Sequence, residues 1–422
     1  MQTIPLIFIV NLLTWTMSTC GLVMPTVSTF LKSSKRVLTE PIVDKVAVVL
    51  GNQASDADSI ISSLCYAKFL QDRHQRTHLP LTCMSRRDLV FRREVQLLLN
   101  TVNVDLGDLV CIEDVPLQTL FDTNCLSLVL SDHNELEHNL SSLSKSVVEI
   151  IDHHADNGLY QWVKPDKRNI AFDKHTNKAL AGSTCTLVAE KYFESLVPMC
   201  AEVATLLMGV IALDTINMDL HAGIGTERDG AALEKLRSIS THSQDELFEL
   251  LRGAKLDPEF WRQLSVDDVL RIDYKTFQSS AMKKRQMPTL GMAAALMPLA
   301  AFLTKEDLYE TAKKVMFEQN LGLLVVMTFV HQPTPHRELL LLADKKHETL
   351  FDAVLQYVQD SSQHSLNCSL LPDEHATANA KFQPTSVSPD KWILSAALKQ
   401  GDAKASRKQV APLLTNFLGS IL

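Results

Sequence analysis

The sequence KVAVVLGNQASDADS, at residues 45–59, combines an apolar run with an acidic loop. Residues 45–50 are rich in β-branched side chains, and residues 51–59 are polar. Residues 60–70 then carry apolar side chains at helical spacing, so the stretch predicts a strand, a loop and a helix in that order. This order is typical of the units from which α/β folds are built.

The same arrangement recurs twice in the first half of the chain. The apolar run Leu126–Leu130 leads into Ser131-Asp132-His133-Asn134, and Val147–Ile151 leads into Asp152-His153-His154. Helical stretches between the runs predict βαβ units with a buried parallel sheet. All three polar motifs would then lie beyond the carboxyl ends of strands, where open α/β sheets bind their ligands.

The length of the chain, 422 residues, suits two domains with a cleft between them. The second half has its own strand candidates at 321–330 and 338–342 and a terminal helix near 410–418. We therefore expect a smaller α/β lobe there and an active site in the cleft between the lobes. The expected division is an N-terminal extension at 1–35, a first domain at 36–242 and a second domain at 243–422.

Composition narrows the classes of protein that the chain can represent. Hydrophobic residues make up 46% and charged residues 21%, which is ordinary for a folded soluble protein. The net charge of −8 gives no general attraction to polyanions, so we expect no nucleic-acid partner. The eight cysteines stand singly, without a CxxC pair, which suits reduced thiols and a cytoplasmic location.

The first 23 residues leave two alternatives open. Residues 4–15 are largely apolar, as in a signal peptide, yet no lysine or arginine precedes them. The run is too short to span a bilayer, so we expect no stable membrane insertion. It is either a secretory or organellar signal or an upstream extension before a start at Met24. We favour the extension because residues 24–32 open a short amphipathic segment.

The acidic motifs supply candidate metal ligands. Asp56 and Asp58 lie two residues apart, and alternate side chains of an extended segment point the same way. The alternative is that Asp58 or Ser59 only caps the following helix. Asp132 follows a strand that we expect near the centre of the sheet, so its carboxylate is well placed to bridge two ions.

Asp152-His153-His154 is more informative, because three consecutive metal-capable side chains have little use in packing. Asp214 follows a predicted buried helix at 201–213, and an acid at a helix C-terminus is unfavourable without a cation. An oxygen-rich set with histidine suits Mg²⁺ or Mn²⁺, with Co²⁺ as a third candidate. Two such ions can activate a water and neutralise charge on phosphate oxygens.

The order of these motifs resembles that of the DHH superfamily of phosphoesterases, and within it most closely the exopolyphosphatase and prune branch. The resemblance extends to Gly182–Val188 and Leu213–Asp219 and covers nearly everything from Lys45 onward. Asn52 stands where the related pyrophosphatases have a metal-binding histidine. His154 is similar to the exopolyphosphatases, whereas prune proteins commonly carry arginine there.

The resemblance implies a role for each matching residue. Asp56 would hold the first ion, Asp58, His153 and Asp214 would hold the second, and Asp132 would bridge both. His154 would contact substrate phosphate, and Asn52 would stand near the first ion. We therefore expect Asp132, His154 and Asn52 to be the catalytic residues.

The second half contributes basic residues. Ser406–Pro412 resembles the element with which the DHH-associated C-terminal domain binds phosphate, and Asp273-Tyr274-Lys275 resembles one that supplies another lysine. The resemblance implies that substrate is bound by Lys275, Arg407 and Lys408, with Arg86 extending the basic track. A guanidinium fork and a lysine point charge both suit phosphate. The alternatives are a solvated helix start for the basic pair and an exposed helix face for Arg86.

The leading functional hypothesis is an exopolyphosphatase that hydrolyses the terminal phosphate of inorganic polyphosphate with a water activated by two metal ions. The enzymatic alternative is an inorganic pyrophosphatase or a prune-like cyclic-nucleotide phosphodiesterase. A prune-like scaffold without catalysis is the third hypothesis, although every expected aspartate is present. A dinucleotide-binding enzyme is disfavoured because residues 51–59 lack the glycine spacing of that fingerprint.

Overall fold

The computed structural model describes residues 25–40, 42, 44–331, 333–371, 385–387 and 392–421. The apolar residues 1–23, and with them the choice between a signal and an upstream extension, lie outside the described residues. Helix α1 (Val27–Val37) confirms the amphipathic segment that follows, because Val27, Phe30 and Leu31 are buried against the first lobe. Among the described residues, no helix is both long and apolar enough to cross a membrane.

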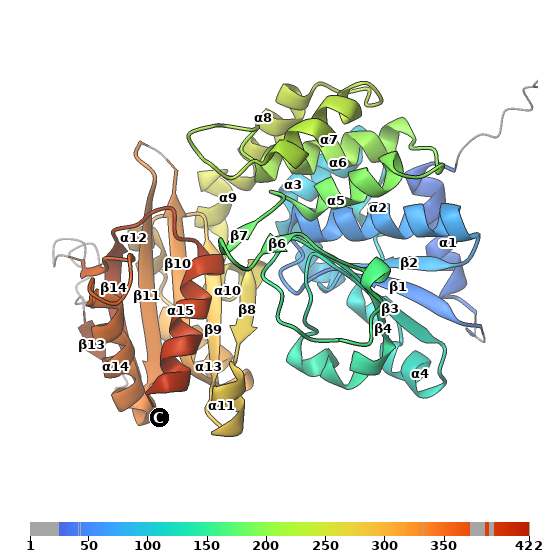
Figure 1. The fold of residues 1–422 in the computed structure, drawn as a ribbon. Helices are drawn as coiled ribbons and strands as arrows, with labels where there is room; N and C mark the ends of the chain where they lie inside the picture. The colour runs from blue at the N-terminus through green and yellow to red at the C-terminus, as the bar shows by residue number, and fades with distance from the viewer. Residues whose placement is uncertain are drawn as a thin grey trace, which may run out of the picture.

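The first lobe is built on a parallel sheet with the strand order β2-β1-β3-β4-β5 (Figure 1). Its strands are β1 (Val46–Leu50), β2 (His78–Leu81), β3 (Leu126–Ser131), β4 (Val147–Asp152) and β5 (Arg168–Ile170). The three predicted strands are therefore confirmed as neighbours at the centre of the sheet. Alternate side chains of these strands enter two separate cores, one on each face.

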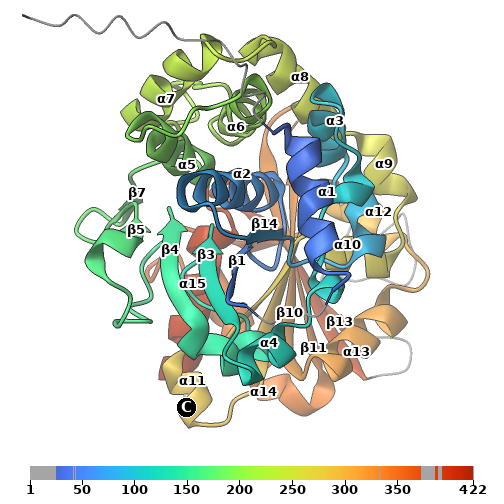
Figure 2. The same ribbon diagram turned by 90° about the vertical axis from the view of Figure 1, so that its right-hand side faces the viewer.

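Helices cover both faces of this sheet (Figure 2). One face is covered by α2 (Ala57–His74), α5 (Thr184–Phe193) and α6 (Ala201–Asp214), and the other by α4 (Leu117–Asp122). Helix α6 is buried along its whole middle because its apolar residues face neighbours on every side. The first lobe also holds α3 (Arg93–Thr101), α7 (Glu227–Arg237), α8 (Gln244–Lys255) and the hairpin of β6 (Phe172–Asp173) with β7 (Lys178–Ala179).

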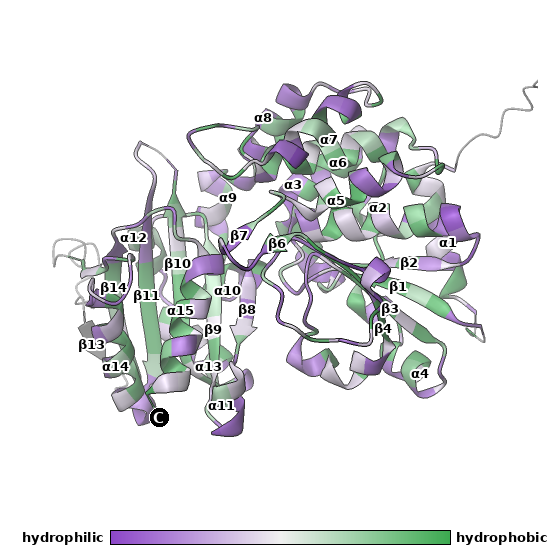
Figure 3. Ribbon diagram, in the orientation of Figure 1, coloured by the Kyte–Doolittle hydropathy of each residue, from purple (hydrophilic) through white to green (hydrophobic). Residues whose placement is uncertain are grey.

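The second lobe has a mixed sheet with the order β12-β14-β11-β10-β9-β8, and β13 also pairs with β14. Its strands are β8 (Tyr274–Phe277), β9 (Thr289–Ala295), β10 (Leu321–Val330), β11 (His336–Asp344), β12 (Ser369–Leu370), β13 (Thr385–Val387) and β14 (Ile393–Gln400). Figure 3 shows hydrophobic residues along β10 and β11, which are the two strands predicted from the sequence. The α/β character of both lobes is confirmed.

Two layers of helices cover this second sheet. One core includes α10 (Val266–Ile272), α12 (Leu299–Leu303) and α13 (Leu308–Glu318), and the other includes α11 (Ser280–Lys284), α14 (Glu348–Gln359) and α15 (Arg407–Ser420). The predicted terminal helix is confirmed as α15. Its N-cap is Ser406, whose hydroxyl accepts from the backbone of Lys408, so the basic pair opens the helix.

The chain passes to the second lobe at α9 (Pro258–Gln263), after α8. Leu247 and Leu251 of α8 pack in the core of the first lobe. The packing therefore favours a domain boundary after Lys255 rather than at 242/243, where the charged, polar sequence had suggested it.

Ion pairs tie the lobes together beside this crossing. Arg93 lies 2.5 Å from Asp257, and Arg271 lies 3.0 Å from Asp88. The buried guanidinium of Arg92 donates to the carbonyl groups of Ala54 and Ile272, one in each lobe. The first acidic loop is thus fixed directly against the second lobe.

Candidate metal centre

The predicted ligands gather at the carboxyl ends of β1, β3 and β4. The strand order reverses between β1 and β3, and α/β sheets of this kind bind ligands outside such a point. Asp132 directly follows β3 and has a φ of 64°, a left-handed conformation that aspartate tolerates better than most residues. This conformation at the end of a central strand is typical of residues held for function rather than for packing.

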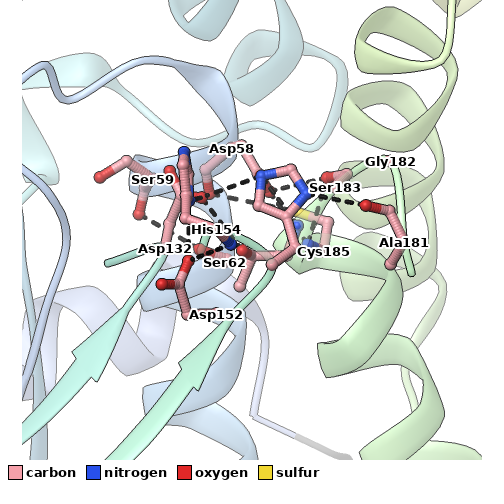
Figure 4. Close-up of polar contacts among 12 residues, drawn as sticks. Asp58, Ser59, Ser62, Asp132, Asp152, His154, Ala181, Gly182, Ser183 and Cys185 are labelled. Atoms are coloured by element: carbon pink, nitrogen blue, oxygen red, sulfur yellow. Dashed lines mark hydrogen bonds and ion pairs between the residues drawn. The ribbon is translucent and has the colours of Figure 1, made fainter. Parts of the chain in front are cut away.

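Asp56 and Asp58 have different partners in the structure. Asp56 is the N-cap of α2 and accepts from the backbone of Ser59 at 3.1 Å, which rules out the alternative that Asp58 or Ser59 is the cap. The helix begins at Ala57, and the Asp58 side chain in its first turn faces the start of α5. There Asp58 accepts hydrogen bonds from Ser183 Oγ at 2.7 Å and Thr184 N at 2.7 Å (Figure 4).

Asp132, His153 and His154 bring one potential ligand atom each within 4.8 Å of one another. His153 Nε2 lies 3.5 Å from Asp132 Oδ1 and 3.7 Å from Asp58 Oδ2. Its Nδ1 lies 2.9 Å from the carbonyl oxygen of Ala181, which can only accept, so Nδ1 carries the hydrogen. Nε2 is therefore the unprotonated nitrogen, and it lies between the carboxylates of Asp58 and Asp132 and beside the ammonium of Lys408, where its lone pair can bind a cation.

His154 is oriented by Asp152 of its own motif. His154 Nδ1 lies 2.8 Å from Asp152 Oδ1, and Asn134 Nδ2 donates to Asp152 Oδ2 at 2.6 Å. Asp152 is fully buried, yet its pKa lies below the ordinary value because the two histidines and Asn134 outweigh the effect of burial. The side chain of His154 is 25% exposed, against 4% for His153, so His154 is the histidine that a substrate can reach.

Asp214 is the last residue of α6, as predicted. Burial and the neighbouring Asp58 raise the pKa of Asp214 well above its ordinary value, while Lys255 acts in the opposite direction. Its Oδ2 is buried and has no hydrogen-bond partner among the described residues. A buried carboxylate oxygen without a partner is costly, and a cation would satisfy it.

The pKa shifts in the cluster indicate that nearby basic residues do not fully balance the charge of its aspartates. Burial raises the pKa of Asp58 and of Asp132, and each is raised further by neighbouring aspartates. Burial also lowers the pKa of His153, as does Lys408, so this histidine is neutral at pH 7. Crowded carboxylates beside a neutral histidine form a donor set that fits hard divalent cations.

The second lobe delivers its basic residues to the same place. Lys408 Nζ lies 3.2 Å from His153 Nε2, so the lobes meet at the cluster. Arg407 contacts Asp273, with 2.5 Å between Nη2 and Oδ1. Burial and Arg407 lower the pKa of Lys275, although Asp56 and Asp132 act in the opposite direction, so Lys275 interacts with both the basic pair and the acidic cluster.

Asn52 and Arg86 have definite partners in the structure. Asn52 Nδ2 donates to Asp132 Oδ2 at 2.6 Å, so Asn52 is in direct contact with the predicted bridging ligand. Arg86 pairs with Asp114 and donates to the backbone carbonyl groups of residues 107 and 109. These contacts hold Arg86 within the first lobe, and its predicted contact with substrate stays a prediction.

Sequence reasoning did not single out several residues that surround the cluster. Thr184 donates to Asp132 Oδ1 at 3.0 Å. Lys255, the last residue of α8, interacts electrostatically with Asp214 and Asp56. Burial alone would raise the pKa of Asp56, but Lys255, Lys275 and Arg92 lower it below its ordinary value. Only the position of Thr184 within the matching stretch Gly182–Val188 gave a signal; the charged segment around Lys255 gave none.

Comparison with known proteins places this geometry in a family. The model of the "DHH family, N-terminal domain" matches residues 46–211, and that of the "DHHA2 domain" matches residues 260–417. The mouse exopolyphosphatase PRUNE1 is 28% identical over 382 residues, which are 89% of this chain and 76% of the mouse protein. The manganese-dependent inorganic pyrophosphatase of Methanothrix thermoacetophila is 26% identical over 281 residues, 66% of this chain and 79% of that protein.

A solved structure supports the same assignment at the level of the fold. A family II inorganic pyrophosphatase of Methanococcus jannaschii superposes with a TM-score of 0.55 at 18% identity, covering 88% of this chain and 99% of that one. The two family models follow each other in the order of the two lobes. With its aspartates and histidines at the ends of β1, β3 and β4, the chain belongs to the DHH superfamily, in the prune and exopolyphosphatase branch.

Proposed function

We propose that this protein is a divalent-metal-dependent phosphoanhydride hydrolase that releases the terminal phosphate of inorganic polyphosphate. The observation that carries the proposal is the contact between Lys408 of the second lobe and His153 of the acidic cluster. This contact brings a basic residue of the second lobe beside the candidate metal ligands of the first, where it would bind an anion held by the metals. Relatives named exopolyphosphatase and manganese-dependent inorganic pyrophosphatase support this class of reaction.

The metal centre would be held by the acidic cluster. We propose that Asp56 holds one ion, that Asp58, His153 and Asp214 hold a second, and that Asp132 bridges them. Mn²⁺ and Mg²⁺ fit this donor set, and Co²⁺ is a third candidate. When bound, such ions lower the pKa of water and offset the negative charge that develops on phosphate oxygens.

The protein side chains would then position the substrate. His154 donates its Nδ1 hydrogen to Asp152 and is partly exposed beside the cluster, and its Nε2 would donate to a phosphate oxygen when the ring is protonated. Lys275, Arg407 and Lys408 would bind phosphate groups from the side of the second lobe, and Asn52 would keep Asp132 in orientation. Docking of the lobes through Arg92 would keep bulk water from the reacting phosphate.

A panel of substrates tests the proposal. Phosphate release from long polyphosphate, pyrophosphate and cyclic AMP should be measured with Mn²⁺, Mg²⁺ and Co²⁺ in turn. Metal-dependent release from polyphosphate is the expected result. Preference for pyrophosphate would favour the pyrophosphatase, which the manganese-dependent relatives make the second candidate. Absence of turnover on every substrate would favour the non-catalytic scaffold.

The remaining expectations stay predictions. A cytoplasmic location rests on the free cysteines among the described residues, such as Cys65, Cys111 and Cys185. We also keep the prediction of a small anionic substrate without a nucleic-acid partner, because the basic residues lie locally at the cluster. The oligomeric state stays open.

A further inference from the structure

The segment Ala181–Cys185, just before and at the start of α5, contacts three of the predicted metal ligands. The carbonyl oxygen of Ala181 lies 2.9 Å from His153 Nδ1. Thr184 donates its backbone N–H to Asp58 Oδ2 at 2.7 Å and its hydroxyl to Asp132 Oδ1 at 3.0 Å. One short stretch of chain therefore contacts Asp58, Asp132 and His153 at the same time.

Asp58 receives further donors from the same segment. Ser183 Oγ donates to Asp58 Oδ1 at 2.7 Å and Cys185 N donates to it at 2.9 Å (Figure 4). The three contacted ligands belong to three separate segments of the chain: the first turn of α2, the residue after β3 and the residue after β4. The relative positions of these ligands therefore depend on where the segment lies.

Asp229, in the first turn of α7, holds this segment from the opposite side. Its carboxylate accepts from Gly182 N at 2.8 Å and from Thr186 Oγ1 at 2.5 Å. It also accepts from the backbone and hydroxyl of Thr226, at 2.7 and 2.8 Å. Asp229 is completely buried, so losing any of these donors would leave a polar group unsatisfied.

Gly182 makes this approach sterically feasible. A Cβ atom at position 182 would lie 2.8 Å from Thr215 Cγ2 and 3.1 Å from Asp229 Oδ2. Those distances leave no room for a side chain without moving α7 or the end of α6. The close contact between the segment and the carboxylate therefore requires glycine at position 182.

We infer that Asp229 is a positioning residue for the metal centre, acting through the segment Ala181–Cys185 on Asp58, Asp132 and His153. The inference rests on the proposed metal dependence. Groups that orient metal ligands without touching the metal typically change metal affinity by about 10- to 100-fold when they are removed. Asp229→Asn keeps the shape but turns an N–H₂ group toward the Gly182 N–H and either Thr186 or Thr226, so at least one contact is lost.

The test compares Asp229→Asn with Asp268→Asn in the full chain. Both aspartates are the third residue of a helix and complete a capping box, Asp229 with Thr226 in α7 and Asp268 with Ser265 in α10. Asp268 lies in the second lobe and also pairs with Arg271, so its loss reports on capping and on this ion pair but leaves the segment Ala181–Cys185 untouched. Binding of Mn²⁺ is measured by calorimetry, and the fold of the metal-free proteins by circular dichroism.

We expect Asp229→Asn to weaken Mn²⁺ binding by about 10-fold or more, while Asp268→Asn changes it by less than about twofold. Wild-type Mn²⁺ affinity in a folded Asp229→Asn protein would overturn the inference. If that variant does not fold, Thr184→Val decides, since it removes only the hydroxyl contact with Asp132; unchanged affinity there also overturns it.

The outcome is separable from the proposed function. If wild-type protein binds Mn²⁺ in a manner that depends on Asp229 but hydrolyses no phosphoanhydride, the function is wrong and the positioning role stands. If wild-type protein does not bind Mn²⁺ at all, the positioning role is wrong as well.

Discussion

Asp132→Asn is the substitution that tests the proposed centre most directly. It removes a charge and keeps the size of the side chain. Asparagine, like aspartate, tolerates the left-handed φ of 64° found at this position, so the end of β3 should keep its conformation. Alanine would be a poorer choice, because it leaves the amide of Asn52 and the hydroxyl of Thr184 without their acceptors.

The effect on stability can be worked from the contacts. Because Asp132 Oδ1 and Asp58 Oδ2 both lie within 3.7 Å of His153 Nε2, the two oxygens are at most about 7 Å apart. Two like charges no farther apart than that repel by at least about 2 kcal/mol at an effective dielectric constant of about 20, and the substitution removes this repulsion. In the variant, the N–H₂ group of the new asparagine faces either the Asn52 amide or the Thr184 hydroxyl, both of which are donors, and this costs about 1–3 kcal/mol of stability. The cost is smaller if the Thr184 hydroxyl rotates and accepts from the new N–H₂ group.

The two effects nearly cancel, so the metal-free variant should unfold within about 1 kcal/mol of metal-free wild type. Turnover should fall by more than the roughly 10- to 100-fold that removal of an orienting group costs, because a bridging ligand is lost. The wild type should be stabilised by about 2.7 kcal/mol when Mn²⁺ is at a hundred times its Kd, and the variant by much less at the same concentration.

The assay is phosphate release from polyphosphate together with urea unfolding, each with and without Mn²⁺. A folded Asp132→Asn protein that keeps wild-type turnover would refute the bridging role. A variant that gains as much stability from Mn²⁺ as wild type does would refute the assignment of Asp132 as a metal ligand.

Three further variants test the surroundings of the centre. Arg407→Ala should lower kcat/KM by about 1.5–3 kcal/mol in transition-state stabilisation while Mn²⁺ affinity is kept, and wild-type efficiency would place the side chain outside the site. Burial raises the pKa of Glu137 from 4.5 to about 7, so the folded wild type loses stability as the pH rises from 4.5 to 7. Glu137→Gln does not titrate, and its free energy of unfolding should therefore rise relative to that of the wild type over this range. A difference in unfolding free energy that does not vary with pH would contradict this. Arg92→Met should lower the free energy of unfolding by about 1–3 kcal/mol, because two buried carbonyl groups lose their donor. The matched control Arg87→Met removes an exposed arginine and should change the free energy of unfolding by less than about 0.5 kcal/mol. Equal effects would argue against Arg92 as a link between the lobes.

The sequence was sufficient for the centre of the first sheet. Strands β1, β3 and β4 are buried on both faces and therefore appear as continuous apolar runs. The edge strands gave no such signal. Strand β2 is four residues long and contains Pro80. Proline has no backbone N–H, and an edge strand such as β2 tolerates it because only one of its sides is hydrogen-bonded to a neighbouring strand. Strand β5 is only three residues long.

The same contrast holds for the candidate site. Asp132 and the pair His153 and His154 stand out because polar residues directly follow apolar runs. Asp229 and Lys255 lie in helices rich in charge, where one more charged residue is indistinguishable from a solvated face. The pattern Thr226-x-x-Asp229 does predict a helix start, but only the fold shows that the capping carboxylate is turned inward.

The placement of positive charge explains how the fold tolerates several buried aspartates in one place. Lys255 ends the last helix of the first lobe, and Lys275 comes from the second lobe; together with Arg92 they lower the pKa of Asp56. Lys408, also from the second lobe, lies against His153. The second lobe therefore offsets the repulsion within the first. Because divalent cations would offset that same repulsion, metal binding and the electrostatic part of lobe docking should be thermodynamically coupled, each reducing what the other contributes.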